Sequence, residues 1–275
     1  MKLFPDYTAL FLIIAIAVST ISCNSSTSTD GGEPPQLPPS ESLEMNFSFF
    51  TFSDIQPNAG TALTGMDTPY SNFLQASSRA LILNGAATTN LALPVAVLAG
   101  AEAVEPEING DGDWEWNYSV SEPNQQFSVR ITAEEQASER VSWNAYVSNS
   151  TLNLDSKLFF SGFSSSDNSF GGWTFYQLFG LNSGAALSEL NWNIENISEA
   201  TLELEILSNR LNRFGNVITL EKINSVKKTT YTDADESIIT EIQWDTDTRE
   251  GTLTTPDYNG GEQACWDSNF LNTEC

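Results

Sequence analysis

The chain has 275 residues, with 36 acidic and 11 basic side chains, no histidine and three cysteines. A net charge of −25 argues against charge-driven binding of DNA, RNA or an anionic membrane surface, because each of these needs a basic patch. The lack of histidine excludes Ser-His-Asp and Cys-His catalysis, and three cysteines are too few for a four-cysteine metal site.

Residues 1–22 have the pattern of an export signal. Lys2 precedes an unbroken apolar run from Leu10 to Val18, which is too short to span a bilayer at ~1.5 Å per residue. The run leads into Thr20-Ile21-Ser22-Cys23, which resembles the lipobox of bacterial lipoprotein precursors. The resemblance implies that Cys23 is lipidated after cleavage and anchors the protein in the outer membrane, facing the periplasm or the cell surface. An ordinary secretory signal with a chance cysteine is the alternative.

Residues 23–44 are predicted to form a disordered tether. Their composition is rich in Ser, Thr, Gly and Pro, and such segments bury too little apolar surface to offset the entropy lost on ordering. Residues 45–275 are predicted to form a single β-rich domain, because no interior linker or repeat interrupts them.

The N-terminal part of this domain combines a predicted strand with a helical segment. Met45 to Phe52 predicts the strand, and a helical segment near 69–104 follows, in which apolar residues recur at helical spacing until Pro94 interrupts an alanine-rich stretch. Residues 80–101 carry no charge, so a transmembrane helix is an alternative. Their polar residues and Pro94 favour one or two helices buried against a sheet.

From residue 112 onward, apolar and polar residues alternate, and turn signals recur at short intervals. In one such stretch, Leu202, Leu204 and Ile206 share a face, and Glu203 and Glu205 share the other. The pattern predicts a mainly β fold: an antiparallel up-and-down meander forming a barrel or half-barrel, with the helices packed on it. A sandwich is the alternative.

The three cysteines suggest one disulfide. With Cys23 used by lipid, Cys265 and Cys275 remain as an even pair in an oxidising compartment. Closing a loop of this size would contribute about 3 kcal/mol in the chain-entropy model.

Six of the seven tryptophans lie in strand-like stretches, mostly on the face with aliphatic neighbours. They either fill the core of a curled sheet or line a cavity for an apolar or carbohydrate ligand. As candidate ligand-binding residues they are Trp114, Trp116, Trp143, Trp173, Trp192 and Trp244.

Other chemical signals are weak. Asp111 and Asp113 lie in a stretch that resembles the start of a calcium loop, but Trp114 and Val120 depart from the EF-hand pattern, so a solvated acidic turn is expected. Carboxylate pairs arise by chance in so acidic a chain, and no catalytic or nucleotide-binding motif is present. We therefore predict neither an enzyme nor a bound cofactor or metal.

Five of the 11 basic residues fall within 19 positions. They are expected to form a charged, solvated sheet edge that discourages strand addition. The alternative is a patch for an anionic ligand or an acidic partner. The five residues are Arg210, Arg213, Lys222, Lys227 and Lys228.

A further resemblance covers roughly residues 110–267. Seven short segments in this range are similar to a recurring pattern in secreted lipoproteins of Gram-negative marine bacteria. The resemblance implies no activity. The segments are Trp114 to Tyr118, Phe127 to Ile131, Val141 to Trp143, Phe160 to Gly162, Gly172 to Tyr176, Pro256 to Gly260 and Cys265 to Asp267.

Two functions follow from the sequence. The first is a lipid-anchored, non-catalytic binding module for an apolar or sugar ligand, which calls for an internal cavity of several hundred Å³. The alternative is a structural or protein-interaction lipoprotein of the cell envelope without a small-molecule pocket. Nucleic acid is not an expected partner, and the sequence leaves the oligomeric state open.

Overall fold

The computed structural model describes residues 32–50, 68–122, 125–136, 138–208 and 213–275. The predicted signal 1–22, the lipidation residue Cys23 and positions 24–31 of the predicted tether lie outside the described residues. One compact unit comprises Glu33–Cys275. Residues 33–44, predicted as part of a disordered tether, therefore belong to the folded unit, which begins earlier than the predicted boundary at residue 45.

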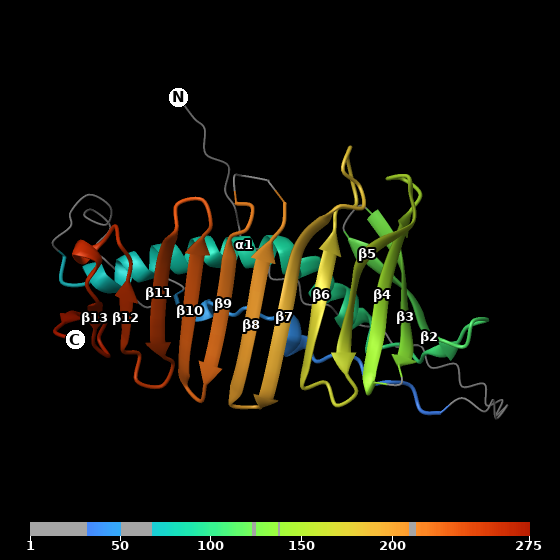
Figure 1. Cartoon of the computed structure of the whole chain (residues 1–275), viewed down its shortest axis with the longest axis horizontal. Helices are drawn as coiled ribbons and strands as arrows, with labels where there is room; N and C mark the ends of the chain where they lie inside the picture. The colour runs from blue at the N-terminus through green and yellow to red at the C-terminus, as the bar shows by residue number, and fades with distance from the viewer. Residues whose placement is uncertain (1–31, 51–67, 123–124, 137, 209–212) are drawn as a thin grey trace. The chain divides into compact units, whose positions relative to one another are not determined.

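The described strands form one antiparallel sheet in which each strand pairs with its neighbours in the sequence (Figure 1). This confirms the predicted mainly β meander. The edge strands β1 and β14 do not pair with each other, so the sheet is open and not closed into a barrel. The strands are β1 (Glu107–Ile108), β2 (Trp114–Glu122), β3 (Gln125–Gln136), β4 (Arg140–Asn149), β5 (Leu154–Ser165), β6 (Phe170–Tyr176), β7 (Ala186–Asn196), β8 (Glu199–Ile206), β9 (Val217–Ile223), β10 (Val226–Asp233), β11 (Ile238–Asp245), β12 (Gly251–Thr254), β13 (Ala264–Trp266) and β14 (Asn272–Thr273).

The one α-helix of the described residues, α1 (Ser71–Ala101), runs along one face of the sheet, which we call the covered face (Figure 1). Near its start, the Asn72 side-chain amide donates a hydrogen bond to the Cys265 carbonyl of β13 at 2.7 Å. Near its end, the Tyr118 hydroxyl of β2 donates to the Val97 carbonyl. The helix thus links opposite ends of the sheet. It continues through Pro94, so the predicted one or two helices are one.

Helix α1 is the one helix among the described residues that is long and apolar enough to cross a bilayer. Its buried side chains recur every three or four positions, as at Phe73, Ala76, Ala80, Leu83 and Ala87. This spacing places them on one side of the helix. Packing on the sheet accounts for the apolar character of that side.

Residues 33–50 also pack on the covered face, where η1 (Ser40–Leu43) contacts α1 and β7. The strand predicted from residue 45 is wrong in its described part, because the chain forms a short 3₁₀ turn, η2 (Ser48–Phe50). The rings of Phe49 and Phe50 both contact Trp244, with centroids 6.2 and 4.8 Å away. A strand would direct these consecutive side chains to opposite faces, so the shared contact with Trp244 is incompatible with one.

Glycines make room for large rings across neighbouring strands. Gly162 of β5 lies between Trp143 of β4 and Trp173 of β6 in register. Gly171 similarly lies opposite Trp192. In each case the indole occupies the space that a Cβ atom would need, at 2.6 Å for Gly162 against Trp173 and 2.5 Å for Gly171 against Trp192.

A disulfide joins Cys265 and Cys275, as the sequence predicted. Cys265 lies in β13, and Cys275 is the last residue of the chain. The bond closes the C-terminal loop beside Trp266, whose indole N–H donates to the Arg249 carbonyl at 2.9 Å.

Candidate functional site

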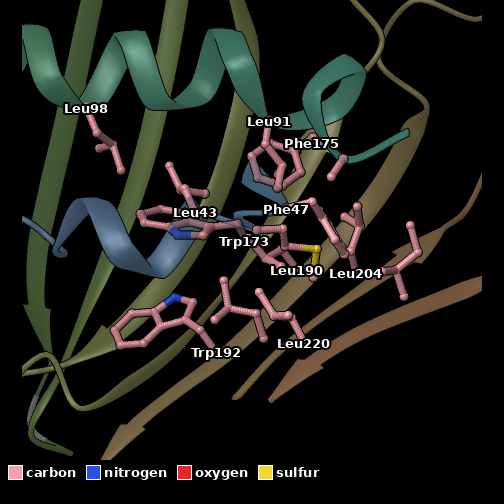
Figure 2. Close-up of a cluster of buried hydrophobic side chains, with 14 of the residues drawn as sticks. Leu43, Phe47, Leu91, Leu98, Trp173, Phe175, Leu190, Trp192, Leu204 and Leu220 are labelled. Carbon is pink, nitrogen blue, oxygen red and sulfur yellow. The ribbon is translucent and has the colours of Figure 1, made fainter. Parts of the chain in front are cut away.

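Five of the six candidate tryptophans are packed into the core. Trp116, Trp143, Trp173, Trp192 and Trp244 are at most 3% exposed. The five rings belong to one buried cluster, which favours core packing over a ligand cavity lined by all of them. Figure 2 shows Trp173 and Trp192 among leucines below α1.

Trp114 is the sixth candidate, and it is half-buried against the same core. No described tryptophan is exposed at the surface. A flat, open tryptophan platform for stacking a sugar ring is therefore not available within the described part of the chain.

The calcium candidates lie in the turn between β1 and β2. The backbone N–H groups of Asp111 and Asp113 both donate to the side-chain oxygen of Asn109, at 2.9 and 3.0 Å. Across the described ranges, no three Asp, Glu or Cys side chains gather where they could hold a metal ion. The side chain of Asn109 thus organises the turn, as in the interpretation of a solvated acidic turn.

Carboxylates show no catalytic arrangement in the described residues. None of the Asp and Glu side chains in those ranges is buried. Two buried carboxylates facing each other in a cleft would have indicated acid–base chemistry, and the described residues contain no such pair.

The predicted basic cluster does not form a sheet edge, because β9 and β10 are interior strands. Arg210 lies outside the described residues. Lys228 pairs with Glu241 on the neighbouring strand at 2.8 Å, and this hydrogen bond raises the pKa of Lys228. Lys222 and Lys227 lie on one face of the sheet, and Lys228 lies on the other.

Lys222 of β9 and Lys227 of β10 lie directly opposite each other in register. Alternation along β9 places Lys222 on the same face as the buried residues Ile218 and Leu220, which is the covered face. Directly opposite side chains on an antiparallel pair have Cβ atoms about 4.5–5.5 Å apart, and like charges there are destabilising. The fold therefore brings two cations together beside its core.

The two lysines border a half-open cavity of about 330 Å³, which we call the lysine pocket. Its sheet side is mostly aliphatic, with the two lysines and Asn196 as its polar members. Its opposite side is formed by residues 33–50, which we call the N-terminal segment. The strands contribute Ile194, Asn196, Ala200, Leu202, Leu220, Lys222 and Lys227, and the turn between β7 and β8 contributes Ile197. The segment contributes Pro39, Glu41, Glu44 and Asn46.

The two ammonium groups of the pocket are held differently. Lys222 Nζ donates to the Ile197 carbonyl at 2.7 Å. Lys227 has no carboxylate oxygen within 4.0 Å among the described residues. Burial, and secondly the charge of Lys222, lower the pKa of Lys227, whereas Glu44 opposes this change. Lys227 is thus a partly desolvated cation without an ion-pair partner in the described ranges.

Replacing Lys222 by methionine is expected to raise the pKa of Lys227. The substitution removes the like charge and leaves Glu44 in place, while burial continues to hold the pKa below its ordinary value. The measurement is NMR titration of the Lys227 side-chain carbons in the full chain. Lys228→Met, on the other face, is the control, and it should leave the pKa of Lys227 nearly unchanged. An unchanged pKa in Lys222→Met would contradict the assigned coupling.

A second groove lies between α1 and β8 to β11. It also measures about 330 Å³ and is lined by aliphatic side chains including Ile82, Leu83 and Ile218. The cation Arg79 at its border is already held by Asp257 at 2.8 Å. Arg213 of the predicted basic cluster also lines this groove and not the lysine pocket.

Sequence reasoning found the lysines but not their pocket. The apolar walls lie on strands that alternation already indicated, so Leu202 and Leu220 carried a signal of burial. Nothing in the local sequence indicated that Glu44 and Asn46 line a pocket, because their position depends on where the N-terminal segment packs. Comparisons with protein-family models, curated proteins and solved structures find no match for this chain.

Proposed function

We propose that the protein is a lipid-anchored, non-catalytic binding module of the bacterial outer membrane that holds a small apolar ligand in the lysine pocket. The lipobox-like residues ending at Cys23 support the anchor. The observation that carries the binding role is the half-open cavity of about 330 Å³ with an aliphatic floor.

The volume and lining of the pocket suit this role. Ligand sites are concave, mostly apolar and of about 300–1,000 Å³, with a few placed polar groups. Leu202 and Leu220 form a floor that is 4% and 5% exposed, and Ile194, Ile197 and Ala200 border it. An apolar ligand is favoured over a sugar, because the described tryptophans are buried or half-buried and offer no exposed stacking platform.

Replacing Ala200 by phenylalanine should block the pocket. Ala200 lies beside Lys222 in register, and an added ring would occupy the space above the aliphatic floor. Binding of the neutral apolar dye N-phenyl-1-naphthylamine, followed by fluorescence, is expected to weaken at least tenfold. Thr201→Phe on the opposite, exposed face of β8 is the matched control, with an expected change below twofold. Equal binding to wild type and Ala200→Phe would overturn the assignment.

Native mass spectrometry of the lipidated full chain tests the role in the cell. The protein is extracted from membranes in mild detergent, and bound small molecules are identified after release. A small apolar molecule retained by wild type and lost in Ala200→Phe supports the binding module.

A structural or protein-interaction role is the second candidate, supported by the tip between β6 and β7. Residues 177–185 carry no charge in a chain of net charge −25, and Phe179 and Leu181 in this tip are 48% and 107% exposed. An exposed apolar tip fits contact with a protein partner. Absence of any retained small molecule, together with equal dye binding in wild type and Ala200→Phe, would favour this role.

A further inference from the structure

We propose that the ligand of the lysine pocket is a single-chain amphiphile with an anionic end group, whose alkyl chain contacts Leu202 and Leu220 and whose head group lies between the ammonium groups of Lys222 and Lys227. The inference rests on the proposed function, because both concern the same pocket. It adds the chemical class of the ligand and the residues that select it.

Charge is the first argument. Acidic residues outnumber basic ones more than threefold in this chain, yet two lysines face each other across β9 and β10. The described ion pairs neutralise Arg79, Arg130 and Lys228, and no carboxylate neutralises Lys227 within 4.0 Å in those ranges. An anion between Lys222 and Lys227 would offset the repulsion between them and supply the missing counter-charge.

The position of the lysines relative to the apolar floor is the second argument. Lys222 follows Leu220 by two residues on the same face of β9, so the charged and apolar parts of the pocket are neighbours. The mouth includes Ile197, which is 92% exposed. A ligand with an alkyl chain and one anionic end matches this division, whereas a wholly apolar ligand would leave Lys227 without an ion-pair partner in the described ranges.

The carboxylates of the pocket would repel an anionic head group, which leaves the side with the two lysines as its place. Glu41 and Glu44 lie on the opposite wall, formed by the N-terminal segment. The Glu44 carboxylate accepts a hydrogen bond from the Asn46 side chain at 3.0 Å. Glu44 also favours the charged form of Lys227. The geometry therefore places an anion on the sheet side and away from the segment.

The test measures how well each of four compounds displaces N-phenyl-1-naphthylamine from the full-length protein. Three of them have a twelve-carbon alkyl chain and differ in the head group. Dodecanoate and dodecyl phosphate carry an anionic head, dodecanol carries a neutral one, and inorganic phosphate has no chain. Both anionic amphiphiles are expected to displace the dye at concentrations at least tenfold lower than dodecanol does. The better of the two identifies the head as a carboxylate or a phosphate ester, and inorganic phosphate alone is expected not to displace the dye.

Variants assign the preference to the two lysines. Lys222→Met and Lys227→Met retain an apolar stem but remove the charge, and each is expected to reduce the preference for dodecanoate over dodecanol to below threefold. Lys228→Met, on the opposite face of β10, should retain the wild-type preference. Lys227→Arg keeps the positive charge and should retain most of that preference. Circular dichroism confirms that each variant is folded, and the comparison of ligands on wild type needs no variant.

The outcomes separate this inference from the proposed function. Equal displacement by dodecanol and dodecanoate in wild type overturns the anionic head but leaves an apolar-ligand module standing. Displacement by inorganic phosphate as strong as by dodecyl phosphate overturns the amphiphile. Failure of the dye itself to bind wild type overturns both. A loss of preference in Lys228→Met equal to that in Lys227→Met overturns the assignment to the pocket.

Discussion

Replacing Gly162 by alanine is expected to lower the free energy of unfolding by about 3 kcal/mol, the upper part of the usual range for overpacking a core. A Cβ atom at this position would lie 2.1 Å from the Gly172 carbonyl oxygen and 2.6 Å from the Trp173 ring. The first neighbour is backbone of the adjacent strand, and it cannot rotate away as a flexible side chain could. Urea unfolding of the full chain, followed by tryptophan fluorescence, measures the change.

Gly85→Ala is the matched control for this substitution. Gly85 lies on the exposed side of α1, and a Cβ atom there would meet nothing within 4 Å. Because alanine is favoured over glycine inside a helix, this variant is expected to be more stable than wild type by about 0.5–1 kcal/mol. A Gly162→Ala variant as stable as wild type would show that Gly162 and the neighbouring Trp173 ring are not closely packed.

The sheet was predictable because its alternation is regular. In β8, Leu202, Leu204 and Ile206 are buried and Glu203 is exposed, as the period of two requires. Short turns then pair consecutive strands, which leads to the meander. Closure was not predictable, because alternation fixes which face is buried but not whether the first and last strands meet.

The lysine pocket was only partly predictable. Lys222 and Lys227 are separated by a hairpin whose connection is Asn224 and Ser225, and such a short loop fixes the register of the two strands. The direct opposition of the lysines was thus encoded locally. Their placement on interior strands, opposite Glu44, depends on the full strand order and on the packing of the N-terminal segment, for which the local sequence gives no rule.

The N-terminal segment shows where composition misleads. A Pro- and Ser-rich stretch has low average hydrophobicity, which predicts disorder. Its few apolar residues are placed where they can be buried: Leu43 is 1% exposed in η1 under α1 (Figure 2), and Leu37 packs against the same core. Prolines on either side of residue 36 restrict the unfolded chain, so the entropy lost on ordering is smaller than for a flexible stretch.

Replacing Leu43 by alanine is accordingly expected to lower the free energy of unfolding by about 2–5 kcal/mol, the range for a buried leucine that leaves a cavity. Leu181→Ala removes the same atoms from a side chain that is 107% exposed, and its expected change is below ~0.5 kcal/mol. Urea unfolding of both variants distinguishes the two interpretations of residues 33–44. Equal, small changes would return the segment to a disordered tether. They would also remove one wall of the lysine pocket, because Glu41 and Glu44 flank Leu43 in that segment.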